Sequence, residues 1–326
     1  MIAFEGREFT REEHESVLDC LLRQGAQVAS FCRTGACQSC VLRATSGVVP
    51  AVAQVGLKDS LKKQGFFLAC VCRPTEPLSV ERCEAAETHS AVVKRVSSLS
   101  ADVLRVWLSR PAGFSFRAGQ FVQLVRPEDG LMRPYSIASL PDAEELELHV
   151  ALLANGQMSG WLCEAEGQPV YVRGPFGECF YQEGELDRPL LLAGTGTGLA
   201  PLLGILRAAL HAGHRGEITL FHGSPSLSGL YLREELEALA DALPELQLVG
   251  SVLEADSAEL GMRGRWRLEA RALDQLVLSR YPKLDALRLY LCGNPALVQS
   301  LRKRAYLAGA SLSRIHSDAF AAPHSA

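Results

Sequence analysis

Residues 30–40 read SFCRTGACQSC and place Cys32, Cys37 and Cys40 in the spacing C-x4-C-x2-C. A later segment, FFLACVCRP, adds Cys70 and Cys72. The C-x4-C-x2-C run followed by a distant cysteine is typical of a 2Fe-2S site, in which two irons are held by four thiolates. Small residues inside the run would let backbone N–H groups approach the sulfurs and stabilise the reduced cluster. The spacing therefore predicts an iron–sulfur centre near the N-terminus.

Two other interpretations of these cysteines remain open from the residues alone. Four thiolates also suit tetrahedral zinc, although structural zinc usually takes paired C-x2-C knuckles. Unligated buried thiols are the third interpretation. The isolated cysteines Cys20, Cys83, Cys163 and Cys179 are expected to be small buried apolar side chains rather than reactive groups.

Composition restricts the class of protein. The chain has 326 residues, 48% hydrophobic and 21% charged, which indicates a globular protein of two or three domains. A net charge of -4 gives no electrostatic footprint for nucleic acid, so no nucleic-acid partner is expected. The acidic start MIAFEGREFTREEHE is unlike a signal peptide, and no apolar run reaches the roughly 18 residues of a membrane span. We expect a cytoplasmic protein, where clustered cysteines indicate metal or catalysis.

The hydrophobic pattern changes twice along the chain. Residues 1–84 predict a β-rich module with a hairpin at Glu5 and Gly6 and a helix near His14–Gln24. After a linker within 81–90, the alternating segments VVKRVSSL, DVLRVWLS and QFVQLV predict an antiparallel β-barrel over 90–186. Residues 187–326 alternate apolar strands with helices, which predicts an α/β domain with a parallel sheet. The fold class is therefore multidomain.

A flavin-binding pattern lies in the predicted barrel. Arg133, Pro134, Tyr135 and Ser136 follow one another on a strand, and NGQMSGWL and VRGPFG come later. An arginine can pair with a pyrophosphate, a tyrosine ring can lie along a flavin, and a serine hydroxyl can reach the flavin N5. A pyrophosphate favours FAD over FMN. The later segments add these candidate cofactor-binding residues: Gly156, Met158, Ser159 at a helix N-terminus, and Gly174.

A second nucleotide pattern opens the α/β domain. The strand LLLAG runs into a glycine-rich loop and a helix that has Pro201 in its first turn; the loop residues are Gly194, Thr195, Gly196, Thr197 and Gly198. Glycines allow a backbone to approach a diphosphate closely. The loop is not a Rossmann fingerprint, because G-x-G-x-G replaces G-x-G-x-x-G and no acidic residue ends the second strand. A late strand ends in LCGNP, with Cys292 and Gly293.

In order and spacing, these motifs resemble a plant-type ferredoxin of the β-grasp fold followed by the FAD and NAD(P) domains of the ferredoxin–NADP reductase superfamily. The resemblance implies that Cys32, Cys37, Cys40 and Cys70, rather than Cys72, hold the cluster. It implies that Cys292 lies beside the nicotinamide and positions hydride transfer. It also implies catalytic roles for Ser136 at the flavin and for Phe320, in the segment SDAF, as an aromatic cover on the flavin.

The choice between NADH and NADPH depends on whether the chain has side chains that can bind the 2′-phosphate of NADP. The family places Ser and Arg after the second strand, and this chain has Ser224 followed by Pro225. Without that arginine we expect NADH, while Arg233 nearby keeps NADPH open.

The complete order of modules resembles the reductase component of multicomponent bacterial oxygenases. That resemblance implies electron transfer from NADH to FAD, then to the 2Fe-2S cluster and on to a terminal oxygenase, a hydroxylase or another one-electron acceptor protein. Hydride brings two electrons and such acceptors take one at a time, so the flavin and cluster divide the pair. A CDP-glucoseen-type deoxysugar reductase and a non-catalytic redox-sensing iron–sulfur protein are the alternatives.

Overall fold

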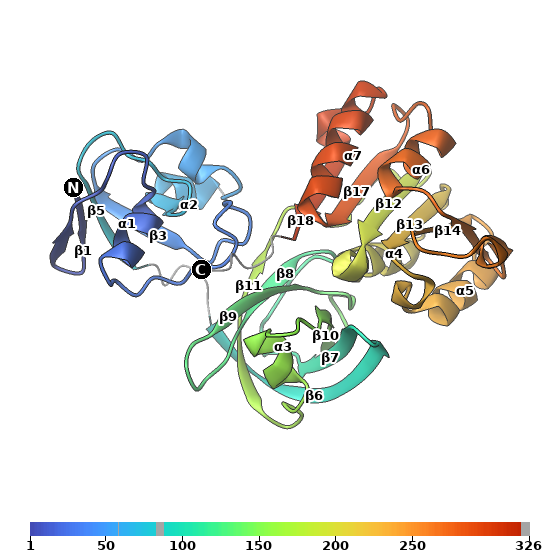
Figure 1. Cartoon of the computed structure of the whole chain (residues 1–326), viewed down its shortest axis with the longest axis horizontal. Coiled ribbons are helices and arrows are strands. Elements are labelled where there is room, and N and C mark those ends of the chain that lie inside the picture. Colours follow the sequence, from blue (N-terminus) through green and yellow to red (C-terminus); the bar gives the residue numbers. More distant parts are fainter. Residues whose placement is uncertain (58, 83–87, 321–326) are drawn as a thin grey trace. The chain divides into compact units, whose positions relative to one another are not determined.

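The computed structural model describes residues 1–57, 59–82 and 88–320 of the chain. These residues form two compact units (Figure 1). Unit 1 comprises Met1–Thr88 with Gln123–Pro134, and unit 2 comprises His89–Val122 with Tyr135–Phe320. The three sheets of the chain follow the predicted order, and the bounds of the predicted domains stay predictions.

The N-terminal sheet has the β-grasp arrangement. Its strands are β1 (Ile2–Phe4), β2 (Arg7–Phe9), β3 (Val41–Ser46), β4 (Phe66–Leu68) and β5 (Leu78–Arg82), in the order β2-β1-β5-β3-β4. The predicted hairpin is confirmed, since β1 and β2 pair antiparallel around Glu5 and Gly6, both with positive φ. Two helices, α1 (Val17–Arg23) and α2 (Asp59–Lys63), and the 3-10 turn η1 (Ala51–Gln54) accompany the sheet.

Helix α1 is shorter than the predicted helix near His14–Gln24. It begins after Ser16, whose Oγ accepts a hydrogen bond from the Asp19 backbone N–H at 3.1 Å and so caps the helix. His14 has φ of 67° and cannot belong to the helix. The predicted linker was too long, because Glu81 and Arg82 end β5 and residues 88–90 begin the next strand. Cys83 and the rest of 83–87 lie outside the described residues.

The second sheet is the predicted antiparallel barrel. Its strands are β6 (Thr88–Ser100), β7 (Val103–Ser109), β8 (Phe121–Val125), β9 (Met132–Ser136), β10 (Glu145–Ala151) and β11 (Pro169–Phe176), in the order β10-β7-β6-β11-β8-β9. An antiparallel bridge between Ile137 and Leu148 joins the end of β9 to β10 and closes the sheet. Helix α3 (Gln157–Leu162) follows β10.

The third sheet is parallel at its centre. Its strands are β12 (Leu190–Thr195), β13 (Ile218–Ser224), β14 (Leu246–Val252), β15 (Gly261–Arg263), β16 (Trp266–Glu269), β17 (Arg288–Gly293) and β18 (Ile315–Ala319), in the order β15-β16-β14-β13-β12-β17-β18. The helices are α4 (Leu199–His211), α5 (Arg233–Ala242), α6 (Leu273–Arg280) and α7 (Pro295–Leu307). The 3-10 turns are η2 (Gly196–Gly198), η3 (Leu227–Gly229), η4 (Ser257–Glu259) and η5 (Leu312–Arg314).

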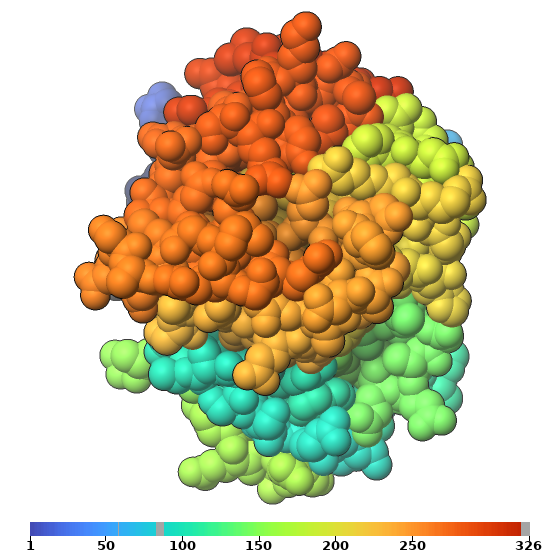
Figure 2. Space-filling view, turned by 90° about the vertical axis from the view of Figure 1, so that its right-hand side faces the viewer, coloured from blue at the N-terminus to red at the C-terminus, as the bar shows by residue number. Residues whose placement is uncertain are grey.

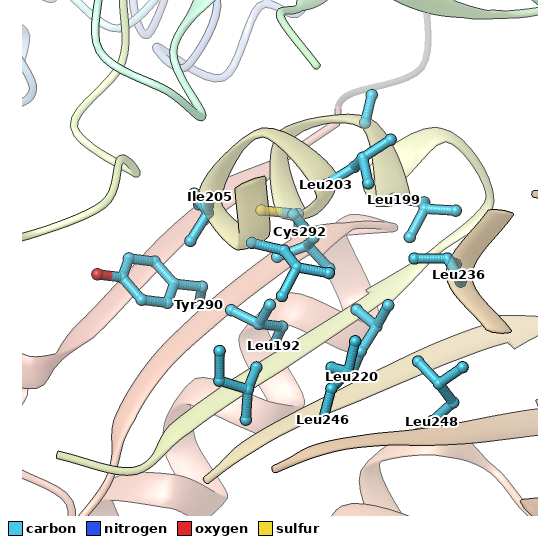
Figure 3. Packing of buried hydrophobic residues seen from close by; sticks show 14 of the residues in the cluster. Leu192, Leu199, Leu203, Ile205, Leu220, Leu236, Leu246, Leu248, Tyr290 and Cys292 are labelled. Atoms are coloured by element: carbon cyan, nitrogen blue, oxygen red, sulfur yellow. The ribbon is translucent and has the colours of Figure 1, made fainter. Parts of the chain in front are cut away.

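Alternation along β12 assigns one helix pair to each face of this sheet. Leu192 faces the core beneath α4 and α5, where Leu199 and Leu203 cover the sheet (Figure 3). Its neighbour Leu191 faces the opposite core, under α6 and α7. The result is the three-layer α/β arrangement visible in Figure 1.

The barrel and the α/β part of unit 2 share a hydrophobic core. Val103, Ala138 and Tyr181 pack in the same cluster as the α4 side of the parallel sheet. In Figure 2 the β6–β7 region, coloured teal, lies directly against the amber surface that contains α5. Among the described residues, no helix combines the length and apolarity needed to cross a bilayer.

Candidate functional site

Four cysteines of unit 1 meet in the structure, as two pairs. Cys32 and Cys37 form the first pair: each backbone N–H points at the other residue's sulfur, at 3.5 Å from Cys32 N to Cys37 Sγ and 3.3 Å from Cys37 N to Cys32 Sγ. Cys40 and Cys70 form the second pair, with Cys70 N 3.5 Å from Cys40 Sγ. All four side chains are buried. The loop and the distant strand end are therefore folded together around one point.

The two thiols of each pair shift each other's pKa. A hydrogen bond from the Cys37 thiol lowers the pKa of Cys32 to about 4, and the same contact, with burial, raises the pKa of Cys37. In the second pair the hydrogen bond from Cys40 lowers the pKa of Cys70 and raises that of Cys40. The charge on Cys32 acts to raise the pKa of Cys70, so the two pairs lie near each other. One thiol of each pair is thus disposed to become a thiolate, the form that binds metal.

The cluster loop uses unusual backbone conformations. Arg33, Gly35 and Gln38 all have positive φ, of 52°, 83° and 58°. Such left-handed residues turn successive N–H groups inwards, and Thr34 N–H also reaches Cys32 Sγ at 3.4 Å. Two non-glycine residues in this region store strain that the surrounding structure must offset. The N–H groups of Cys32, Thr34 and Cys37 therefore point at cysteine sulfurs.

The pairing distinguishes the metal interpretations. Tetrahedral zinc needs four donors around one centre, whereas each iron of a 2Fe-2S cluster takes two thiolates. Two neighbouring pairs of buried thiols with N–H groups directed at sulfur fit the cluster.

The remaining cysteines differ from the four. Burial raises the pKa of Cys72 to about 12, and neighbouring arginines, not other thiols, are its remaining influences. Cys20 and Cys179 are buried, as predicted. Cys163 is exposed, so that prediction was wrong: the residue follows the last turn of α3, and its Sγ contacts the Ser159 carbonyl at 3.4 Å.

The parallel sheet brings the nucleotide motifs together. The chain runs from β12 outward to β13 and β14, then returns to the other side of β12 as β17 and β18. A crevice at the carboxyl ends of the strands is the usual ligand site at such a switch point. Here Gly194 is opposite Cys292, and Gly293 is opposite Ala319. Phe320 N–H then donates to the Gly293 carbonyl at 2.7 Å.

The glycines at the carboxyl ends of β12 and β17, the proposed nucleotide crevice, have different functions. A Cβ on Gly194 or Gly198 would lie 2.9 or 2.6 Å from the Cys292 carbonyl oxygen, and one on Gly293 would lie 2.7 Å from the Thr195 carbonyl. These three glycines let the loop pack against β17. A Cβ on Gly196, with φ of 53°, would meet nothing within 4 Å, and this residue is exposed. Gly196 is therefore the glycine whose face is open to a ligand.

The other candidates of the crevice are arranged along the loop. The hydroxyl of Thr195, a half-buried residue like Thr197, accepts a hydrogen bond from Asn294 N–H at 3.2 Å. Pro201 is in the first turn of α4, as expected. Ser224 is buried and its Oγ lies against Gly229, where a Cβ would come within 2.0 Å of it. Phe320 is half-buried, and the residues after it lie outside the described ranges.

Cys292 and Asp318 are paired across β17 and β18. Cys292 is completely buried, and burial, together with the contact to Cys179, raises its pKa. Burial also raises the pKa of Asp318 to about 6. The sequence motifs did not single out Asp318. The available signal was its place in the segment SDAF, two residues before Phe320.

The flavin motif is on the barrel. Ser136 is 5% exposed at the end of β9, and Arg133 Nη1 donates to the Met132 carbonyl at 2.8 Å. Pro134 and Tyr135 are half-buried. Gly174, with φ of 143°, is in β11 beside β8, so that a Cβ would lie 3.4 Å from the Phe121 carbonyl oxygen.

The second flavin segment folds as a short turn of helix. Gly156 precedes α3, and Met158 and Ser159 are buried. Ser159 Oγ donates to the Gly156 carbonyl at 3.2 Å and accepts from Leu153 N–H at 3.4 Å. This hydroxyl is therefore engaged within its own loop.

A buried polar network that the sequence did not reveal links the barrel to the crevice. Glu147 is bound by Arg105 Nε and Arg207 Nη1, both at 2.7 Å, and by His149 Nε2 at 3.1 Å. Burial alone would raise the pKa of Glu147, but the His149 hydrogen bond and the arginine charges lower it. The Tyr231 hydroxyl is 3.1 Å from His149 Nδ1.

The network ends at the nucleotide loop. The Tyr231 ring also meets His222 edge to face at 5.4 Å, and His222 Nε2 donates to the Gly196 carbonyl at 3.2 Å. Burial lowers the pKa of His222 to about 4, so the ring is neutral. These residues are distant in sequence and carry no local motif, so only the fold brings them together.

Comparison with known families covers most of the chain. Residues 2–75 match the 2Fe-2S iron-sulfur cluster binding domain, residues 90–181 the oxidoreductase FAD-binding domain, and residues 192–303 the oxidoreductase NAD-binding domain. The predicted fold class and the predicted cofactor classes are confirmed by these matches. They leave the choice between NADH and NADPH untested.

Full-length relatives share this organisation. The ferredoxin–NAD(P)+ reductase component of the naphthalene 1,2-dioxygenase system of Pseudomonas putida is 34% identical over 318 residues, 94% of this chain and 93% of the relative. The reductase subunit of an aromatic O-demethylase of Amycolatopsis is 32% identical over 97% of this chain and 96% of the relative. The crystal structure of the Amycolatopsis cytochrome P450 reductase GcoB aligns over 99% of both chains, with 30% identity and a TM-score of 0.69. The chain therefore belongs to the family of ferredoxin–NAD(P)+ reductase components, which join a 2Fe-2S domain, an FAD-binding domain and an NAD-binding domain in one polypeptide.

Proposed function

We propose that this protein is the NADH-dependent reductase of an oxygenase system, passing electrons through FAD and a 2Fe-2S cluster to a terminal oxygenase, a hydroxylase or another one-electron acceptor protein. The observation that carries the proposal is the combination, on one chain, of two neighbouring thiol pairs with a nucleotide crevice at a switch point. Relatives named as reductase components along nearly their whole length support it.

In this proposal Cys32 and Cys37 hold one iron, and Cys40 and Cys70 hold the other. The hydrogen bonds from Thr34 and from the paired cysteines' own N–H groups would offset negative charge on the sulfurs. Cys72 stays outside the cluster as a protonated, buried thiol, because burial raises its pKa to about 12.

The flavin site is proposed on the barrel. Arg133 would pair with the pyrophosphate, Pro134 and Tyr135 would line the ring system, and the Ser136 hydroxyl would be the candidate hydrogen-bond partner of the flavin N5. Gly156, Met158 and Ser159 would shape the neighbouring turn, and Gly174, with φ of 143°, would place the end of β11 beside the flavin site. Because the Ser159 hydroxyl is already engaged with Gly156 and Leu153, we assign this turn a contribution through its backbone.

The nicotinamide nucleotide site is proposed in the crevice. The exposed face of Gly196 is the open approach to the diphosphate, while Gly194, Gly198 and Gly293 hold the loop against β17. Cys292, at the end of β17, would lie beside the nicotinamide, and Phe320 would cover the flavin ring. Thr195, Thr197 and Pro201 complete the loop, and Ser224 is at the adenosine side.

The coenzyme is proposed to be NADH. Ser224 is followed by proline, and its hydroxyl lies against Gly229. The residue directly after Ser224 is therefore not an arginine that could bind a 2′-phosphate in a bidentate way, although Arg233 at the start of α5 keeps NADPH open.

The bound groups would supply hydride acceptance and the division of an electron pair into single electrons. The chain's own contribution is placement, because the geometry of the reacting groups determines the rate of hydride transfer. We also propose a cytoplasmic location, because cysteines clustered for metal binding rather than for disulfides are typical of a reducing compartment.

The test is to purify the chain and measure iron, labile sulfide and FAD, then follow reduction of cytochrome c by NADH and by NADPH. Two irons, two sulfides and one FAD per chain, with a higher kcat/KM for NADH, are expected. A colourless protein, or flavin without iron, would overturn the proposal. Negligible turnover with both coenzymes would favour a redox sensor, and transfer to a deoxysugar dehydratase but to no oxygenase component would favour the deoxysugar reductase.

A further inference from the structure

Residues 179–185, which follow β11 of the barrel, lie along one side of β17. Alternate residues of a strand point to the same side, so Arg288, Tyr290 and Cys292 face one direction. Arg288 Nη1 donates to the Gln182 carbonyl at 2.6 Å, and the Tyr290 hydroxyl accepts from Gln182 N–H at 3.0 Å. Arg288 also forms an ion pair with Glu185. The segment is thus fixed in register along β17.

Cys179 is the first residue of this segment, and its sulfur contacts Cys292, the last of the three β17 residues that face this side. Its Sγ is 3.7 Å from Cys292 Sγ, and both side chains are buried, at 2% and 0% exposure. The backbone of Cys179 is close-packed against the barrel, because a Cβ on Gly119 would lie 2.6 Å from the Cys179 carbonyl oxygen. One sulfur therefore belongs to the barrel and the other to the parallel sheet.

This contact is suited to holding a side chain rather than to redox chemistry. Burial raises the pKa of Cys292, and a protonated, buried thiol is a poor nucleophile and resists oxidation. In this position Cys179 prevents Cys292 Sγ from turning towards the barrel, where Tyr290 and Ile205 also belong to the shared core (Figure 3). A thiol is a weak hydrogen-bond partner, so the restraint is mainly steric.

We propose that Cys179 is a positioning residue for hydride transfer: it fixes the Cys292 side chain at the nicotinamide end of the crevice from the barrel side. The inference rests on the proposed function, because it assigns Cys179 a role only through Cys292. It identifies a residue of the FAD-binding part that determines the geometry of the NAD-binding part.

The test is a double-mutant cycle in the complete, cofactor-loaded protein. Cys179→Ala, Cys292→Ala and the double variant are mixed with saturating NADH, and flavin bleaching is followed in a stopped-flow instrument. The long-wavelength absorbance of the stacked nicotinamide–flavin complex is recorded at the same time. Cys20→Ala is the matched control, since it makes the same change in a buried residue of unit 1.

With Cys292 present, Cys179→Ala should slow flavin reduction about fivefold and weaken the long-wavelength band, while the KM for NADH changes less than twofold. In the Cys292→Ala background the same substitution should change the rate less than twofold, because the residue it acts through is gone. The Cys20→Ala control should match the unmodified protein in both readouts.

An equal decrease in both backgrounds would show a general structural effect and overturn the inference, as would a rate unchanged by Cys179→Ala. Should Cys179→Ala lose FAD, Cys179→Ser, which nearly preserves the side-chain volume, takes its place in the same cycle, with a decrease of about twofold expected only when Cys292 is present. If instead the unmodified protein shows no flavin reduction by NADH, the proposed function has failed, which is a separate outcome.

Discussion

Gly196 and Gly213 provide a matched test of the nucleotide crevice. Both have positive φ, 53° and 73°, and a Cβ on either would meet no atom within 4 Å. Alanine at either position would therefore pay the same backbone cost, about 1 kcal/mol for an L-residue in the left-handed region. Gly213 lies beyond the end of α4, and Gly196 lies at the carboxyl end of β12.

The two substitutions should differ in coenzyme binding. The methyl group of Gly196→Ala would stand on the exposed face of the loop, where the diphosphate must approach the backbone. We expect the KM for NADH to rise tenfold or more, which corresponds to about 1.4 kcal/mol or more of lost binding. Gly213→Ala should leave the KM unchanged. The assay is ferricyanide reduction over a range of NADH concentrations, with urea unfolding of each variant as the measure of stability.

Equal KM values for the two variants would refute the assignment of Gly196 to the diphosphate. A much larger stability loss in Gly196→Ala than in Gly213→Ala would refute the steric part of the reasoning. The hydrogen bond from His222 to the Gly196 carbonyl holds the loop in both variants, so the backbone itself should not move.

Three further substitutions test the packing and charges of unit 2. Gly198→Ala would bring a Cβ to 2.6 Å from the Cys292 carbonyl oxygen, so overpacking should lower the free energy of unfolding by about 1–3 kcal/mol in urea titrations. Glu147→Ala would remove one of the two carboxylates that Arg105 and Arg207 share; both arginines keep their ion pairs with Glu235, so the cost should be about 1.5–3 kcal/mol in the same measurement. Asp318→Asn should stabilise the protein by about 3 kcal/mol at pH 7 and by almost nothing at pH 3.5, measured as the difference from the unmodified protein across pH.

The sign of the Asp318 effect follows from its raised pKa. Between pH 3.8 and about 6 the folded protein keeps a proton that the unfolded chain has lost, so this residue's contribution to stability falls as pH rises through that window. A stability difference that stays constant with pH would contradict the burial of this carboxyl. For Glu147, exposed Glu144→Ala is the control and should change stability by less than about 0.5 kcal/mol.

The local motifs were predictable because each one is contiguous. The spacing of Cys32, Cys37 and Cys40, the glycine loop after β12 and the alternating barrel strands are all read from neighbouring residues. Their meeting in space then follows from simple topology: the switch point at β12 places Gly194 opposite Cys292. The division of the four cysteines into two neighbouring pairs needed the structure.

What the sequence could not provide depends on packing between distant segments. In the sequence Gly194, Gly196 and Gly198 look alike. Only the structure shows that Gly194 and Gly198 pack against β17, whereas Gly196 has an open face. The exposure of Cys163 depends on where α3 ends against the barrel. The contacts of Cys179 with Cys292 join residues that no local pattern connects.

The most direct test of the account compares Cys70→Ser with Cys72→Ser in two acceptor assays. Ferricyanide can take electrons from the flavin, while cytochrome c reports electrons leaving by way of the cluster. We predict that Cys70→Ser loses iron and NADH-driven cytochrome c reduction but keeps FAD and ferricyanide reduction, and that Cys72→Ser keeps all four. Unaltered iron content and cytochrome c reduction in Cys70→Ser, with loss of both in Cys72→Ser, would contradict the assignment of the electron path.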